Sequence, residues 1–239
     1  MKTIVTLAAM ALALTACDRS DPPVKKLERA AEDAVVAVEG ETLPRRAEGP
    51  YAPRNECLDE PGAGEFLASL RKAVQARDTK LLAPLVAEDI RLDFGGGAGR
   101  ATLAERLAEN EGALWEQLDE VLTLGCASDG ATLTMPWYFA QDIGSRDPYG
   151  AFVVTGEGIP VYASSRSEET LQTLDWAMVD SVAYTEIVED DGSGRREMQL
   201  DDGTRGFIDE QNLRALIGYR LLASRRNNRW RITSFVAGD

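Results

Sequence analysis

The sequence predicts an α+β fold, in which a helix-rich α+β domain is closed by a C-terminal β-hairpin and carries a small all-β barrel as an insertion. Three observations support this prediction. Apolar residues recur at helical spacing across residues 65–124, short runs separated by turn residues fill residues 151–216, and two alternating runs end the chain. With 44% apolar and 28% charged residues, the chain of 239 residues has an ordinary globular composition.

The first sixteen residues have the pattern of an export signal. Met1 and Lys2 form a short positive segment, and residues 4–16 form an uncharged apolar stretch that is too short to span a bilayer. Residues 14–17 read LTAC, which resembles the lipobox of bacterial lipoproteins. This resemblance implies cleavage before Cys17 and lipidation of that cysteine. The alternative is a plain signal peptide that happens to end near a cysteine.

A lipidated Cys17 would anchor the protein to a membrane, because two or more acyl chains hold a protein stably at a bilayer. We therefore expect a cell-envelope protein that is lipid-anchored and faces the periplasm. Asp18 follows directly, and an acidic residue there resembles the inner-membrane retention signal of enterobacterial lipoproteins. The choice between inner and outer membrane stays open, with Asp18 favouring the inner one.

Residues 17–56 have the composition of a flexible tether. Charge-rich polar stretches alternate there with Pro22, Pro23, Pro44, Pro50 and Pro53. We expect this segment to let the folded part stand off the lipid surface.

The three cysteines of the chain predict a disulfide. Once Cys17 is lipidated, Cys57 and Cys126 are left, and an exported protein meets an oxidising compartment. Both lie at the ends of predicted elements, where loops can meet. A metal-binding thiolate pair and two free thiols are the alternatives, but two thiolates without histidine make a poor zinc site.

Residues 57–150 are predicted to alternate between helices and strands. The strand at 89–94 alternates so that Ile90, Leu92 and Phe94 share one face, and Pro136 favours an edge or a bulge for the last strand. The predicted elements, in chain order, are helical segments at 65–76 and 81–86, a strand at 89–94, helices at 102–109 and 113–124, and a strand at 131–139.

The glycine-rich residues 95–99 are predicted to form a plain turn from a strand to a helix. A phosphate-binding P-loop needs a lysine followed by serine or threonine, whereas Arg100, Ala101 and Thr102 follow here. Backbone amides in such a turn could still hold an anion at a helix N-terminus. Glycine is nevertheless the default residue wherever a positive φ is required, so the plain turn is favoured.

Residues 151–216 are predicted to form the small barrel, from strand candidates at 159–162, 171–174, 177–185, 196–200 and 204–208. Residues 160–163 read PVYA and residues 202–208 read DGTRGFI, in an order that resembles the bacterial SH3-like domain over about residues 157–216. The sequence departs from that family at residues 175–176 and 197–198. The resemblance implies cell-wall or protein ligands.

Two alternating strands, at 218–224 and 229–236, are predicted to form a hairpin around Asn227 and Asn228. On the first strand, Tyr219, Leu221 and Ala223 are predicted to face one way. The second strand offers a candidate partner face, formed by Trp230, Ile232, Ser234 and Val236. The domain at 57–150 has too few strands of its own, so we expect residues 217–239 to complete its sheet and the barrel to be inserted. The alternative is two tandem domains, with the hairpin extending the barrel.

This element order is similar to the cone-shaped α+β fold of nuclear transport factor 2. Helices come first, followed by a strand, further helices, another strand and a closing hairpin that contains Trp230. Because enzymes and binding proteins can share one fold, the resemblance does not decide the function.

The charge balance excludes several classes of function. The chain has 26 basic and 40 acidic residues, a net charge of −14, and no histidine. The acidic excess argues against a nucleic-acid partner, and the missing imidazole excludes Ser-His-Asp catalysis. Residues 211–239 instead carry six arginines against Asp239 alone, a net charge of +5. These arginines could engage lipid headgroups or anionic wall polymers, but pairing with the acidic body is the favoured interpretation.

Candidate ligand-binding residues are aromatic, although core packing is the favoured alternative for each of them. They are Trp137, Tyr138, Tyr149, Trp176 and Tyr184. Asp93, Glu116, Asp119 and Glu120 lie near apolar segments, but no pair stands out as catalytic.

No catalytic residue, cofactor or metal site is therefore predicted. We expect a non-catalytic, lipid-anchored envelope protein that binds peptidoglycan or an envelope protein partner through the SH3-like module. The alternative is a periplasmic hydrolase that uses paired carboxylates.

Overall fold

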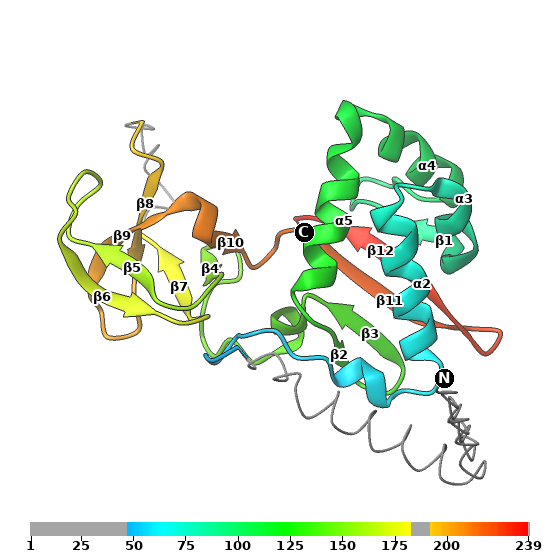
Figure 1. Ribbon diagram of the computed structural model, residues 1–239, viewed down its shortest axis with the longest axis horizontal. Coiled ribbons are helices and arrows are strands. Elements are labelled where there is room, and N and C mark those ends of the chain that lie inside the picture. Colours follow the sequence, from blue (N-terminus) through cyan, green and yellow to red (C-terminus); the bar gives the residue numbers. More distant parts are fainter. Residues whose placement is uncertain (1–46, 183–191, 239) are drawn as a thin grey trace, which may run out of the picture. The chain divides into compact units, whose positions relative to one another are not determined.

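The computed structural model describes residues 47–182 and 192–238, with two mostly antiparallel sheets and helices in an α+β arrangement (Figure 1). The predicted α+β class is confirmed. The predicted signal peptide, Cys17, Asp18 and residues 17–46 of the predicted tether lie outside the described residues. Within the described ranges, no helix combines the length and apolar character that crossing a bilayer requires.

Among the described residues, four α-helices and the five strands of one sheet form what we call the first part of the fold. The helices are α2 (Ala63–Gln75), α3 (Thr79–Leu82), α4 (Arg100–Ala108) and α5 (Ala113–Thr123). The strands are β1 (Val86–Arg91), β2 (Ala127–Ser128), β3 (Thr132–Met135), β11 (Arg220–Arg226) and β12 (Arg229–Val236). The predicted helices at 65–76, 102–109 and 113–124 are therefore confirmed to within about two residues.

The C-terminal hairpin completes the first sheet, as predicted. The strand order is β1-β12-β11-β3-β2, so β11 and β12 lie between strands that precede them by more than 80 residues in the chain. Asn227 and Asn228 both have positive φ, of 52° and 60°, which is what the two central residues of a type I′ hairpin turn require. β12 pairs in parallel with β1, whereas β11 is antiparallel to both of its neighbours.

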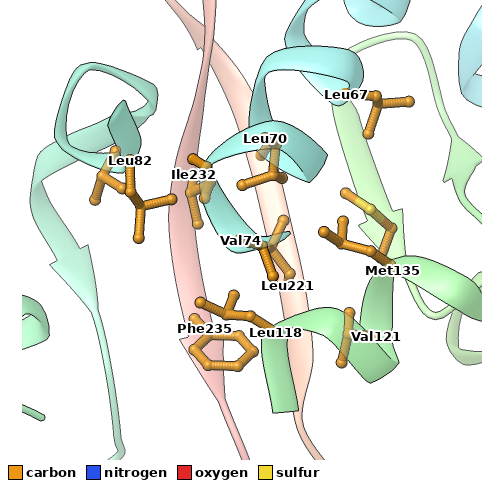
Figure 2. Close-up of a cluster of buried hydrophobic side chains, with 14 of the residues drawn as sticks. Leu67, Leu70, Val74, Leu82, Leu118, Val121, Met135, Leu221, Ile232 and Phe235 are labelled. Atoms are coloured by element: carbon orange, nitrogen blue, oxygen red, sulfur yellow. The ribbon is translucent and has the colours of Figure 1, made fainter. Parts of the chain in front are cut away.

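Helices α2 and α5 lie across the strands β3, β11 and β12 (Figure 1). Their apolar stripes meet the inner face of the sheet, where Leu70 and Val74 of α2 and Leu118 of α5 cluster with Leu221 and Phe235 (Figure 2). All five side chains are at most 2% exposed. The space between helices and sheet is thus filled by apolar side chains, and this filled layer is the main core.

A β-bulge corrects the predicted face of β12. Ala223 pairs with Ile232, but Leu222 pairs with Ser234, so Thr233 is an extra residue on β12. The bulge shifts the inward and outward alternation by one position, and Phe235 joins Trp230 and Ile232 in the main core. The prediction that Ser234 and Val236 share the face of Trp230 and Ile232 is wrong for this reason.

The strand predicted at 89–94 begins and ends earlier than its alternation suggested. β1 covers Val86–Arg91, and Phe94 lies in the following turn with 47% of its surface exposed. Ile90 and Leu92 are buried as predicted. The prediction for Phe94 is wrong because the carboxylate of Asp93 accepts hydrogen bonds from the amides of Gly95 and Gly97, which bends the chain before Phe94 can continue the strand.

The strand predicted at 131–139 is also shorter, since β3 ends at Met135. A cis peptide bond joins Met135 to Pro136, and residues 137–140 form a 3-10 turn. Proline lacks the amide hydrogen that a sheet ladder needs, so the strand ends here.

Residues 151–215 form a separate seven-stranded antiparallel sheet, with strand order β10-β4-β7-β8-β9-β5-β6. Its strands are β4 (Ala151–Val154), β5 (Ile159–Tyr162), β6 (Thr170–Leu174), β7 (Met178–Ser181), β8 (Arg195–Gln199), β9 (Arg205–Asp209) and β10 (Leu213–Ala215). The sequence pattern missed β4 and β10. In the chain this sheet falls between β3 and β11, and Val154, Val161, Val179, Met198 and Ile208 form its own core.

Residues 47–56 are ordered against the folded part, which corrects the tether prediction for that stretch. The Tyr51 amide donates to the carbonyl of Trp176 at 2.9 Å, and the Cys126 amide donates to the carbonyl of Arg54 at 2.7 Å. Ala52 is completely buried. Composition misled here because Arg54 uses its charge locally, donating to the carbonyls of Ala47, Gly49 and Pro53.

The predicted disulfide is present and joins Cys57 to Cys126, across a sequence separation of 69 residues. Both cysteines are buried, with at most 2% of their surface exposed. Their Cα atoms are 5.7 Å apart, within the usual range for a disulfide. The bridge ties the turn before α2 to the segment that follows α5.

Candidate functional site

Two of the predicted aromatic ligand-binding residues are core residues. Trp137 is 9% exposed and Tyr138 is 1% exposed, and both pack with Leu124, Ala151 and Met178. Burial also raises the pKa of the Tyr138 hydroxyl, which keeps it neutral. These rings are covered by protein and cannot stack on an external ligand, so the prediction is wrong for them.

The other aromatic candidates differ from one another in exposure. Trp176 is half-buried against the same cluster as Trp137, and its backbone bonds to Tyr51 and Gly156 hold it in a left-handed turn with φ of 43°. Tyr149 is 45% exposed in the loop before β4. Tyr184 lies outside the described residues. Trp137, Tyr138 and Trp176 therefore pack in one apolar cluster, whereas the ring of Tyr149 is exposed.

Of the candidate carboxylates, Asp119 is exposed and the other three are bound by arginine side chains. Asp93 binds Arg106 and the amides of Gly97 and Gly95, and these hydrogen bonds hold the pKa of its carboxyl below the usual value. A carboxyl of this kind stays ionised and is a poor proton donor. The contacts of Asp93 give this residue a structural role, because they hold the turn at residues 93–97 in place.

The three acidic residues of α5 do not form a catalytic pair. Glu116 bonds to Arg77 at 3.3 Å on the surface, whereas Glu120 pairs with Arg214 of β10. Asp119 is exposed. Within residues 47–182 and 192–238, no group of three or more potential ligand side chains is arranged to hold a metal ion.

An aromatic pair that the sequence analysis did not single out lies on the second sheet. Tyr162 of β5 and Phe207 of β9 are cross-strand partners, and both are half-buried. Their neighbours Val161 and Ile208 point into the core of this sheet, so the alternation places Tyr162 and Phe207 on its opposite face. We call this pair the Tyr162–Phe207 face. The alternating burial within each short strand was the signal that could have found it.

The Tyr162 ring is held in place by Arg195. The guanidinium carbon lies 3.5 Å from the ring centroid, a cation–π contact. Arg195 is itself fixed by Asp209 at 2.9 Å and by the carbonyl of Ser167 at 2.7 Å. The Tyr162 ring is therefore held in one orientation, which lowers the entropic cost of binding a ligand against it.

Two surface hollows lie elsewhere on the described residues. The first has a volume of about 670 Å³, and four arginines and two acidic residues are part of its lining. The residues that line it are Val86, Ala87, Glu88, Asp89, Arg100, Arg226, Asn227, Arg229 and Arg231. We call it the arginine groove. The second, of about 630 Å³, includes Asp180 and Asp201, and one guanidinium, that of Arg146, binds both carboxylates.

The six C-terminal arginines do not share one role. Arg214 pairs with Glu120, as the favoured interpretation expects, and Arg220 lies between the rings of Phe94 and Phe139. The guanidinium groups of Arg226 and Arg229 contact no acidic side chain among the described residues. Pairing with the acidic body is thus wrong as a general account of this segment.

Comparisons with known proteins give little guidance. The chain matches no family model and no curated protein. A solved structure named Rd1NTF2_05, in a substituted form, is 10% identical, with 74% of this chain and 96% of that chain covered and a TM-score of 0.25. An NTF2-like protein with a cystatin-like fold from Novosphingobium aromaticivorans is 15% identical, with 90% and 88% covered and a TM-score of 0.25. Scores this low carry no argument about fold or function.

Proposed function

We propose that the protein is a non-catalytic, lipid-anchored component of the bacterial cell envelope, whose residues 151–216 act as an SH3-like module that binds peptidoglycan or an envelope protein. The signal pattern and the LTAC motif support the anchor. The Cys57–Cys126 disulfide supports an oxidising compartment, because disulfides are rare in the cytosol.

The observation that carries the binding role is the Tyr162–Phe207 face. Tyr162 and Phe207 are cross-strand partners on the face of the sheet opposite its core, and Arg195 fixes the Tyr162 ring. Partly exposed aromatic rings offer an apolar surface for a sugar ring or a peptide side chain, and a tyrosine adds a hydroxyl for hydrogen bonding. The arginine and the surrounding acidic side chains Glu168 and Asp209 supply polar contacts at the rim.

The hydrolase alternative is best represented by the hollow that contains Asp180 and Asp201. Paired carboxylates are the chemistry that glycoside hydrolysis requires. Both carboxylates are bound to Arg146. This shared ion pair gives them a structural role, because it links β7 to the turn after β8. The binding role is the better supported of the two, because Tyr162 and Phe207 keep part of their surface exposed, whereas both carboxylates are already bound by one guanidinium.

We expect the purified full chain to co-sediment with isolated peptidoglycan at low salt, and Phe207→Ala to weaken this binding. Loss of one aromatic stacking contact should reduce the affinity roughly two- to tenfold. Tyr149→Ala is the matched control, since Tyr149 is an exposed ring outside the Tyr162–Phe207 face. Absence of wild-type sedimentation would remove the wall-binding proposal, and equal loss in both variants would remove this face as its site.

The lipid anchor has its own test. Wild-type protein expressed in a bacterial host should partition into the detergent phase of Triton X-114, whereas Cys17→Ala should move it to the aqueous phase, because no acyl chains can then be attached. Asp18→Ser is the control and should still partition with detergent. Equal partitioning of wild type and Cys17→Ala would show that Cys17 is not lipidated.

A further inference from the structure

The arginine groove gathers positive charge from three places in the first part of the fold. Arg100 is the first residue of α4, while Arg226, Arg229 and Arg231 come from β11 and β12. Glu88 and Asp89 of β1 also line the groove, so its lining has four positive and two negative side chains. The balance of +2 contrasts with the chain's net charge of −14.

The arginines of the hairpin are arranged at a cost to stability. Arg226 and Arg229 are direct cross-strand partners, and like charges in that position repel each other. Neither guanidinium has an acidic partner among the described residues. Arg231, two residues further along the same face of β12, donates to the carbonyl of Trp230. Arg226, Arg229 and Arg231 therefore line one groove, in which Arg226 and Arg229 are held as neighbours despite their like charge.

Arg100 adds positive charge to the same groove. One of its terminal nitrogens donates to the carbonyl of Val86 at 2.8 Å, which anchors the side chain against β1. Its Nε is buried and has no hydrogen-bond partner among the described residues. Protein covers the Nε, so Arg100 contributes its positive charge to the groove rather than a hydrogen bond from this atom.

We propose that the arginine groove binds an anionic phosphate group, held by Arg226, Arg229, Arg231 and Arg100. Guanidinium groups donate paired hydrogen bonds that match the geometry of phosphate oxygens. A volume of about 670 Å³ is in the range of small-ligand sites and exceeds what a single phosphate fills. The ligand is thus a phosphate-bearing molecule, either a soluble phosphate compound or the headgroup of an anionic lipid.

The test uses the full chain in a neutral detergent and isothermal titration calorimetry with two probes. Inorganic pyrophosphate represents a soluble phosphate ligand, and short-chain phosphatidylglycerol below its micelle concentration represents a lipid headgroup. Wild type should bind at least one probe. The double variant Arg226→Gln/Arg229→Gln should lose at least about tenfold in affinity, because it removes two positive charges and their charge-assisted hydrogen bonds to the phosphate.

Arg225→Gln is the matched control, since it removes the same charge from the neighbouring position. Arg225 pairs with Trp230 on the other face of the hairpin and donates to the carbonyl of Pro61. It should bind like wild type. Binding of pyrophosphate would assign a soluble ligand, and binding of phosphatidylglycerol alone would assign a headgroup. Failure of wild type to bind either probe would overturn the proposal, as would equal losses in Arg225→Gln and the double variant.

Discussion

Removal of the Cys57–Cys126 bridge by the double substitution Cys57→Ala/Cys126→Ala should lower the free energy of unfolding by about 2–4 kcal/mol. The bridge closes a loop with a sequence separation of 69 residues, which contains all of α2 to α5. Without it, the unfolded chain gains the conformational freedom that the closed loop restricts. Urea unfolding followed by circular dichroism measures the change as a lower midpoint concentration.

The reductant-treated wild type provides the control for this experiment. It should unfold at nearly the same urea concentration as the double variant, whereas reductant should leave the double variant unchanged. Both cysteines are buried, so some of the loss in the double variant comes from the two missing sulfur atoms. Equal midpoints for oxidised wild type and the double variant would show that the bridge does not stabilise the fold.

The disulfide and the hairpin could be predicted because their signals are local or chemical. Two cysteines remained once Cys17 was assigned to the predicted lipidation motif. Asn227 with Asn228 is a combination that tolerates the positive φ of a tight turn. Helix α2 was equally clear, since its apolar stripe runs over three turns. Each of these features depends on residues that are neighbours in the sequence or on a small number of candidates.

Other features depended on partners that are distant in the chain. β2 has two residues and β10 has three, too few to show alternation, and they exist because β3 and β4 offer them hydrogen bonds. The Thr233 bulge is likewise set by the register against β11. A pattern of alternating residues cannot show where one residue is skipped.

The candidate site could be predicted least well, because aromatic residues serve both cores and surfaces. Trp137 and Tyr138 were candidate ligand-binding residues because they are aromatic, and the structure buries both of them. Tyr162 and Phe207 were visible as parts of the SH3-like motif, but their pairing depends on the contact between β5 and β9. Which of two alternating faces meets the core is decided by tertiary packing, which residue type alone does not reveal.

Phe235→Ala should cost about 3–5 kcal/mol of unfolding free energy, as truncation of a buried phenylalanine usually does. Phe235 is 2% exposed and pairs with Leu221 across the hairpin (Figure 2). Its ring centroid lies 4.9 Å from that of Tyr219. The small side chain would leave a cavity between α5 and the sheet that the packed helices cannot fill. Thermal and urea unfolding measure the loss, and Phe235→Leu should show a smaller one if Phe235→Ala does not fold.

Phe94→Ala is the matched control, because it makes the same change in a phenylalanine that is 47% exposed. Its cost should not exceed about 1 kcal/mol, the size of the surface contact that its ring makes with Arg220. Simple alternation predicts the reverse order, since it places Phe94 on the inner face with Ile90 and leaves Phe235 on the outer face of β12. The two variants therefore test the early end of β1 and the Thr233 bulge together. A larger loss for Phe94→Ala than for Phe235→Ala would contradict the bulged register and the core built on it.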